Sequence, residues 1–105
     1  MKKKLIELAY ARSGDKGSNV NIGLIARSGK DYDLLEKLVT SEKVHRYFSA
    51  LSPLETVRYE LPNLHALNFV LKGVLQGGGS LSLRSDAQGK ALGQALLEME
   101  IDDEH

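Results

Sequence analysis

The residues best suited to bind a ligand lie in one short polar stretch, RSGDKGSNVN, which runs from Arg12 to Asn21. Glycines there permit positive φ angles, which turn successive N–H groups toward a bound anion. Arginine holds a carboxylate or phosphate through two hydrogen bonds, and lysine adds a point charge. We expect an anion cradle or, as the alternative, a polar hairpin loop with solvated charges. The candidate ligand residues are Arg12, Ser13, Gly14, Asp15, Lys16, Gly17, Asn19 and Asn21.

A second glycine-rich stretch follows later in the chain. Three consecutive glycines each cost about 0.5–1 kcal/mol relative to alanine, which a ligand or a second chain close to the backbone would explain. The alternative is the end of a helix running into a turn. The candidate ligand residues here are Gly77, Gly78, Gly79, Ser80 and Arg84. We expect this stretch and the Arg12–Asn21 stretch to lie together and form the main polar cleft.

Several familiar chemistries are absent from the sequence. Neither stretch has the Gly-Lys-Ser/Thr ending of a phosphate-binding P-loop, and no G-x-S-x-G elbow is present. The histidines are not spaced as metal ligands, and there is no cysteine. The residue types of a Ser-His-Asp triad are present, namely Ser13 or Ser80, His65, and Asp15 or Asp86. Any small sequence offers such a set, so it carries almost no weight. We therefore predict no catalytic residue, no metal and no cofactor.

The hydrophobic pattern predicts strands and helices in alternation. Strands are expected over residues 5–11, 20–26, 55–61 and 81–83, and the RSGDKGSN segment is expected to be the loop of a long hairpin between the first two. Residues 30–51 are typical of helix, with a break and a new N-cap at Thr40-Ser41-Glu42. Residue 101 is expected in a closing strand or a tail.

Two further helices are expected in the second half of the chain. One begins at Pro62-Asn63 and ends at the three glycines, because Leu64, Leu67, Leu71 and Val74 keep helical spacing. On it, His65 and Asn68 lie one turn apart and could face a pocket, although exposed helix positions are the favoured interpretation. The last helix is expected over residues 90–99, with Leu92, Leu96 and Met99 inward.

This order of elements favours an α+β fold, a ferredoxin-like sandwich with a mostly antiparallel sheet and helices on one face. A parallel Rossmann sheet fits poorly, because it needs more strand–helix alternations than the length allows. The chain has 105 residues and a mass of 11.5 kDa, which predicts one domain spanning residues 1–105.

Charge and composition limit the classes of molecule that this protein could bind. Fourteen basic residues balance fourteen acidic ones, so no overall field attracts nucleic acid or an anionic membrane. No apolar run is long enough for a membrane span, and the three lysines at the start are not followed by the apolar segment of a signal peptide. We expect a soluble, cytoplasmic protein, without nucleic-acid or membrane partners.

Three segments together resemble a known family. ARSGDKGSNVNIGLIAR, YELPNLHALNFVL and GGGSLSLRSDAQGKALGQALLEMEI are similar to the AtuA-like small domain of the acyclic terpene utilisation family, over nearly the whole chain. The resemblance implies a ferredoxin-like α+β fold, and it associates relatives with acyl-CoA and terpenoid breakdown. In many relatives the domain is fused to a large domain, and we expect this chain to be the free-standing form without it. The motif residues that match, beyond those given above, are Gly23, Pro62, Asn63 and Asn68.

Three functions are compatible with these observations. The first is an accessory domain or subunit that binds an anionic small molecule, such as an acyl-CoA or carboxylate, or completes a site on a larger partner of the same family. The second is a small lyase, hydratase or isomerase acting on an acyl thioester, with Asp15 or His65 as acid–base group. The third is a structural oligomerisation module. We expect a homo-oligomer, a dimer or a multiple of one, because Ile25 and the alternating strand from Val57 to Leu61 cannot all be covered by the helices.

Overall fold

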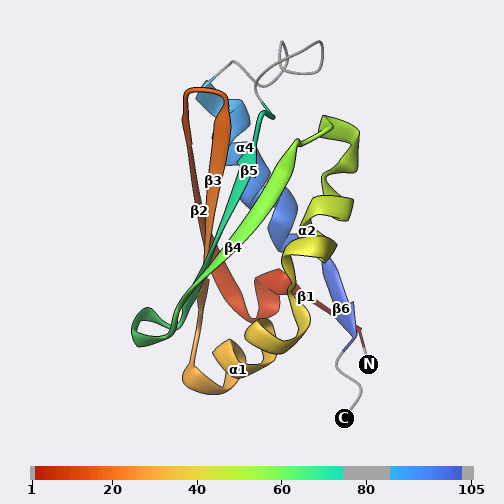
Figure 1. Cartoon of the computed structure of the whole chain (residues 1–105). Helices are drawn as coiled ribbons and strands as arrows, with labels where there is room; N and C mark the ends of the chain where they lie inside the picture. The colour runs from red at the N-terminus through yellow and green to blue at the C-terminus, as the bar shows by residue number, and fades with distance from the viewer. Residues whose placement is uncertain (1, 75–85, 103–105) are drawn as a thin grey trace.

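The structure, a computed structural model, describes residues 2–74 and 86–102. Its centre is a four-stranded antiparallel sheet with strand order β2-β3-β5-β4 (Figure 1). The strands are β2 (Ala9–Lys16), β3 (Asn19–Ala26), β4 (Glu55–Leu61) and β5 (Ala66–Lys72). Helices α1 (Gly29–Leu38), α2 (Ser41–Tyr47) and α4 (Asp86–Leu97) pack on one face of this sheet. The expected α+β architecture is confirmed, and the other face of the sheet carries no described helix.

A separate two-stranded sheet joins the two ends of the described chain. Strand β1 (Lys2–Lys4), which consists of the three lysines, pairs antiparallel with β6 (Glu100–Asp102). Ile101 is buried in the closing strand, which confirms one of the two alternatives for that residue. A 3-10 turn, η1 (Leu5–Glu7), then leads into β2. The strand expected over residues 5–11 was wrong in its first half, because Leu5 is buried within this turn.

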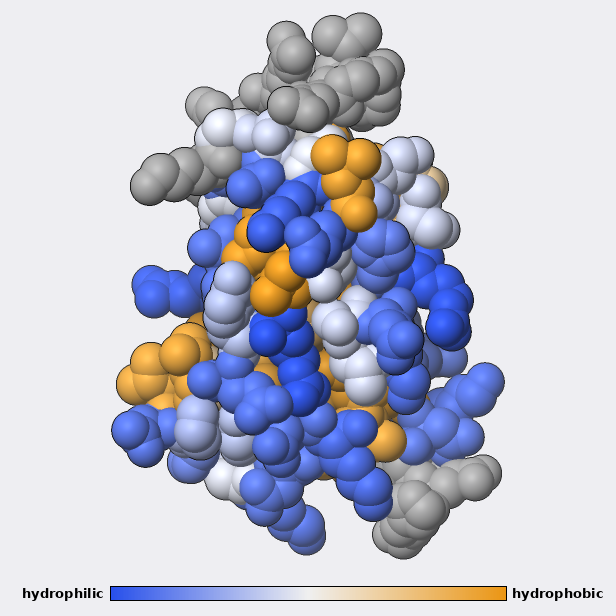
Figure 2. All heavy atoms as spheres, in the orientation of Figure 1, coloured by the Kyte–Doolittle hydropathy of each residue, from blue (hydrophilic) through white to orange (hydrophobic). Residues whose placement is uncertain are grey.

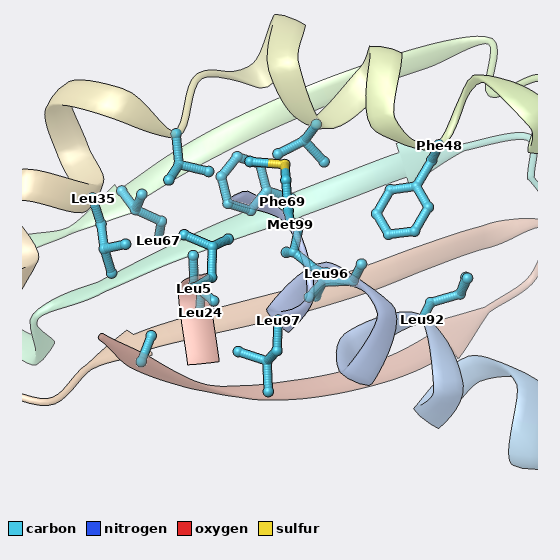
Figure 3. Packing of buried hydrophobic residues seen from close by; sticks show 14 of the residues in the cluster. Leu5, Leu24, Leu35, Phe48, Leu67, Phe69, Leu92, Leu96, Leu97 and Met99 are labelled. Carbon is cyan, nitrogen blue, oxygen red and sulfur yellow. The ribbon is translucent and has the colours of Figure 1, made fainter. Parts of the chain in front are cut away.

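The core lies between the helices and the covered face of the sheet (Figure 3). Alternate residues of the two central strands point into it, and all are fully buried: Val20, Ile22 and Leu24 of β3, and Leu67, Phe69 and Leu71 of β5. Helix α4 adds Leu92 and Leu96, which confirms their predicted inward direction. The alternation of β3 was read correctly, because its two faces differ sharply in polarity.

The helix break at Thr40 is confirmed. The Ser28 hydroxyl caps α1 by accepting a hydrogen bond from the Asp31 N–H at 3.1 Å. The Thr40 hydroxyl does the same for α2, accepting from the Lys43 N–H at 3.1 Å. Because each helix has its own cap, the two short helices can lie at an angle over the sheet, as Figure 1 shows.

The helix expected from Pro62 to Val74 was wrong. Residues Pro62–Leu64 form a 3-10 turn, η3, and β5 follows it as a central strand. A central strand is apolar on both faces, so its residues also satisfy helical spacing. His65, with φ of +52°, makes the left-handed turn that starts the strand.

The polar segment before β3 was also misread. Most of RSGDKGSN is strand, since β2 continues to Lys16 and only Gly17 and Ser18 form the turn. Gly17 has φ of +62°, as a two-residue hairpin turn with glycine first requires. The last helix, expected over residues 90–99, instead spans Asp86–Leu97. The strand predicted over residues 81–83 and the run Gly77–Gly79 lie outside the described residues.

Candidate functional site

The candidate ligand residues of β2 are divided between the two faces of the sheet. Side chains alternate along a strand, so Arg12 and Gly14 face the open side, whereas Ser13 and Asp15 belong to the helix side. The Ser13 hydroxyl indeed lies against Gly93 of α4. A loop could have brought all these side chains to one ligand, but a strand cannot.

The strand register aligns the open face in rows that cross all four strands. Each row takes one residue from β2, β3, β5 and β4, in that order. The three central rows are Tyr10–Ile25–Ala66–Leu61, Arg12–Gly23–Asn68–Tyr59 and Gly14–Asn21–Val70–Val57. The polar side chains of this face therefore gather in its middle, around two glycines.

A shallow depression of about 520 Å³ lies at this place on the sheet. Its lining is Arg12, Ser13, Gly14, Asp15, Asn21, Gly23 and Asn68. Gly23 forms part of the floor, because a Cβ there would lie 3.7 Å from the Arg12 carbonyl oxygen and 3.8 Å from Asn68 Oδ1. Five of the eight candidate residues from the Arg12–Asn21 stretch thus border the depression, although the side chains of Ser13 and Asp15 belong to the helix side.

Asn68 and Gly23 join the site, although neither was among the candidate ligand residues. Asn68 was assigned to a helix, which hid its position beside Arg12. The signal that could have placed it is the alternation of Leu67, Phe69 and Leu71 around it, which is typical of a strand.

Arg12 provides the positive charge of the depression. Its side chain is exposed, and no hydrogen bond or ion pair to its guanidinium occurs within residues 2–74 and 86–102. The amides of Asn21 and Asn68 each offer both a donor and an acceptor beside it. A carboxylate or phosphate held here would meet one cation and two amides, with glycine backbone below.

The remaining candidates of this stretch have structural places. Asn19 Oδ1 accepts a hydrogen bond from the Gly73 N–H at 3.1 Å, which ties the start of β3 to the end of β5. Gly17 forms the hairpin turn, and Lys16 is the strand residue before it. Gly77, Gly78, Gly79, Ser80 and Arg84 lie outside the described residues, so their expected meeting with this stretch stays a prediction.

The possible acid–base residues do not converge. Asp15 lies in the row of Val20 and Leu71, whereas His65 precedes Ala66 at the opposite end of β5. Six residues of strand between these positions correspond to roughly 20 Å. The His65 ring instead lies 6.0 Å from the Tyr32 ring, measured between centroids. This distance excludes a Ser-His-Asp triad that uses Asp15 together with His65.

Another histidine is held in place on the helix layer. His45 Nδ1 lies 2.8 Å from the Thr56 hydroxyl, in a polar depression of about 420 Å³ between α2 and β4. Its lining is entirely polar, namely Ser41, Glu42, His45, Arg46, Ser49 and Thr56. The Thr56 bond orients the ring and fixes α2 to the sheet edge.

Large apolar side chains flank the Arg12 depression. Tyr10 and Tyr59 expose 55% and 50% of their surface at the two outer strands of the open face. The Arg27 guanidinium lies over the Tyr10 ring, 4.2 Å from its centroid. At the end of β4, Leu61 is 41% exposed and Leu64 67% exposed. Their hairpin projects at the lower left of Figure 1, where Figure 2 shows hydrophobic surface.

Comparison with protein-family models identifies the family of this chain. Its residues 3–102 match the family model described as the AtuA ferredoxin-like domain. The chain belongs to this family. No curated protein and no solved structure gave a significant match. The family membership confirms the resemblance seen in the sequence, together with its ferredoxin-like fold.

Within the described ranges, no group of three or more His, Asp or Glu side chains is placed to hold a metal ion. No helix in the same ranges is both long and apolar enough to cross a membrane.

Proposed function

We propose that this AtuA ferredoxin-like domain is a non-catalytic accessory domain or subunit that binds the anionic group of a small molecule at the Arg12 depression. The observation that carries the proposal is an exposed arginine without an ion-pair partner in the described structure, set between two asparagine amides over a glycine floor. Arginine binds carboxylates and phosphates bidentately, so either group is a suitable ligand. An acyl carboxylate and an acyl-CoA both carry one.

The surroundings of the depression favour an amphipathic ligand. Tyr59 lies in the same row as Arg12, and Tyr10, Ile25 and Leu61 form the neighbouring row. A hydrocarbon chain leaving the anionic group would lie along apolar surface in either direction. The depression is nevertheless open on its outer side, so a ligand held here by this chain alone stays partly in water. A second protein surface would complete the site.

Nothing in the geometry favours the enzyme alternative. Asp15 belongs to the helix side of β2, and His65 lies about 20 Å away along the sheet. General acid–base catalysis requires its groups within hydrogen-bonding reach of one substrate. A lyase, hydratase or isomerase mechanism that uses both residues is therefore not supported.

The test is a titration of ¹⁵N-labelled protein with sodium octanoate and, separately, with octanoyl-CoA. We expect backbone shifts at Arg12, Asn21, Gly23 and Asn68 at millimolar ligand, and at least a tenfold weaker affinity in Arg12→Gln. Arg46→Gln is the matched control, because Arg46 is also exposed but lies on α2. Absence of shifts in the wild type, or equal weakening by the two variants, would reject the proposal.

A further inference from the structure

Two glycines of the open face lie in rows where the corresponding position on the other half carries a larger residue. Gly14 stands at the β2 end of its row, and Val57 stands at the β4 end of the same row. In the next row, Gly23 on β3 neighbours Asn68 on β5. At these two positions, space on one half of the sheet corresponds to a larger side chain on the other half.

We infer that a second copy of this chain packs face to face on the open sheet, related by a two-fold axis that runs parallel to the strands between β3 and β5. A half-turn about this axis places β2 over β4 of the second copy and β3 over its β5. Rows then lie over the same rows. Gly14 receives Val57 and Gly23 receives Asn68, each from the other copy.

Charge also matches in this arrangement. Arg12 and Tyr59 occupy opposite ends of one row, so each guanidinium lies over a tyrosine ring of the other copy. A cation over the face of a tyrosine is attractive, more so when water is excluded. An axis running across the strands through this row would instead place the two Arg12 side chains together. Like charges disfavour that alternative.

Apolar side chains are exposed at both edges of the open face. Tyr10 and Tyr59, which expose 55% and 50% of their surface, together present on the order of 200 Å². Leu61 and the partly exposed Ile25, Val57 and Val70 extend this apolar surface around the polar middle of the face. Antiparallel sheets that keep an apolar outer face usually pack it on another sheet about 10 Å away. A two-fold contact is the commonest way to do so.

This interface does not depend on a ligand. In this arrangement β4 and β5 of the second copy cover the depression around Arg12, so the second copy and an anionic ligand compete for the same space. Dimerisation and anion binding are measured separately, so either can fail without the other. A partner of different sequence on the same face is the competing outcome.

The first experiment fills the space that the second copy needs. No atom of the described residues lies within 4 Å of a Cβ placed on Gly14, so we expect Gly14→Val to leave the fold of the single chain intact. We expect the wild type at micromolar concentration to sediment at twice the mass of one chain, and Gly14→Val to dissociate at least about tenfold more readily. Adding Val57→Ala to Gly14→Val restores the space and should restore the dimer. Ala50→Val, on an exposed residue of the turn Ser49–Leu51, is the control and should leave the dimer unchanged.

A second experiment tests the register. The sequence contains no cysteine, so single cysteines can be introduced without background. Under mild oxidation, a mixture of Gly14→Cys and Val57→Cys chains should form a disulfide-linked pair, whereas neither variant alone should do so efficiently. A monomeric wild type, a Gly14→Val variant that dimerises normally, or cross-linking of Gly14→Cys with itself would each overturn the inference.

Discussion

Gly93 of α4 lies directly over Ser13 of β2, so closely that a Cβ on Gly93 would be 2.9 Å from Ser13 Oγ and 3.5 Å from Ala11 Cβ. The helix-facing side of β2 carries the small residues Ala9, Ala11 and Ser13. They allow α4 to rest on an edge strand of the sheet. The helix therefore covers the helix side of β2.

Because the space at Gly93 is this limited, we expect Gly93→Leu to destabilise the fold by about 1–3 kcal/mol through overpacking. The better helix propensity of leucine recovers less than about 1 kcal/mol of that loss. Denaturant unfolding of both proteins measures the difference. Gly14→Ala is the matched control, since its Cβ meets open space, and it should change stability by less than about 0.5 kcal/mol. A Gly93→Leu variant as stable as wild type would show that α4 does not seat on β2 in this way.

Asn19 has a structural role, whereas Asn21 belongs to the proposed binding site. Asn19 Oδ1 holds the Gly73 N–H, and Gly73 is itself buried at the end of β5. We expect Asn19→Ala to lower the free energy of unfolding by about 1–3 kcal/mol, because a buried N–H loses its acceptor. Asn21 is exposed beside the Arg12 depression. Asn21→Ala should leave stability nearly unchanged while weakening octanoate binding, and the opposite pattern in the two variants would contradict these roles.

Sequence reasoning found the elements whose two faces differ in polarity. The strand from Asn19 to Ala26 alternates clearly, and the two short helices carry capping residues at Ser28 and Thr40. Such signals are local, so they can be read without knowing the neighbours. The helix direction of Leu92 and Leu96 was readable for the same reason.

The errors fall where tertiary context decides the structure. The strand Ala66–Lys72 is apolar on both faces because it lies in the centre of the sheet, and that position is not visible in its own sequence. The polar residues from Arg12 to Lys16 were read as a loop, but β2 is an edge strand with one open face, where polar residues are tolerated. Once both segments are strands, Arg12, Gly23 and Asn68 fall in one row, and the depression follows from the register.

Arg58 ties β4 to the end of α1. Its Nη1 donates to the Glu36 carbonyl oxygen at 2.8 Å and to the Val39 carbonyl oxygen at 3.0 Å, at the end of α1. The side chain is only 18% exposed, so these bonds are largely shielded from water. The strand thus turns Thr56 and Arg58 toward the helices and Val57 and Tyr59 outward.

We expect Arg58→Met to destabilise the fold by about 1.5–3 kcal/mol, because it removes charge-assisted bonds from two helix-terminal carbonyls. Methionine keeps the length and apolar contacts of the arginine stem. The rate of amide hydrogen exchange should increase most in α1, because the C-terminal end of this helix loses its hydrogen bonds to Arg58. A loss confined to β4, with α1 unchanged, would be inconsistent with this capping role.

Tyr32 places a hydroxyl in the core, where it has no hydrogen-bond partner among the described residues. Burial raises the pKa of this phenol above its ordinary value, with a smaller contribution from the Glu36 charge. The folded state therefore holds the phenolic proton more tightly than the unfolded chain does. At neutral pH both states are protonated and pH has no effect through this group, but the folded state loses stability as pH rises above about 10.

Tyr32→Phe should consequently be at least as stable as wild type at pH 7, by about 0–1.5 kcal/mol, because it removes an unsatisfied buried hydroxyl. Its advantage over the wild type should increase between about pH 10 and pH 11.5. In that range the Tyr32 phenol of the wild type ionises more readily in the unfolded chain than in the folded protein, which favours unfolding. Urea unfolding of the two proteins at pH 7, 10 and 11 measures both effects. Tyr47→Phe is the contrasting variant, since the Tyr47 hydroxyl donates to the Ala95 carbonyl oxygen at 2.7 Å and its loss should destabilise at pH 7. If Tyr32→Phe lost stability at pH 7 as Tyr47→Phe does, the Tyr32 hydroxyl would have to be hydrogen-bonded in the folded protein.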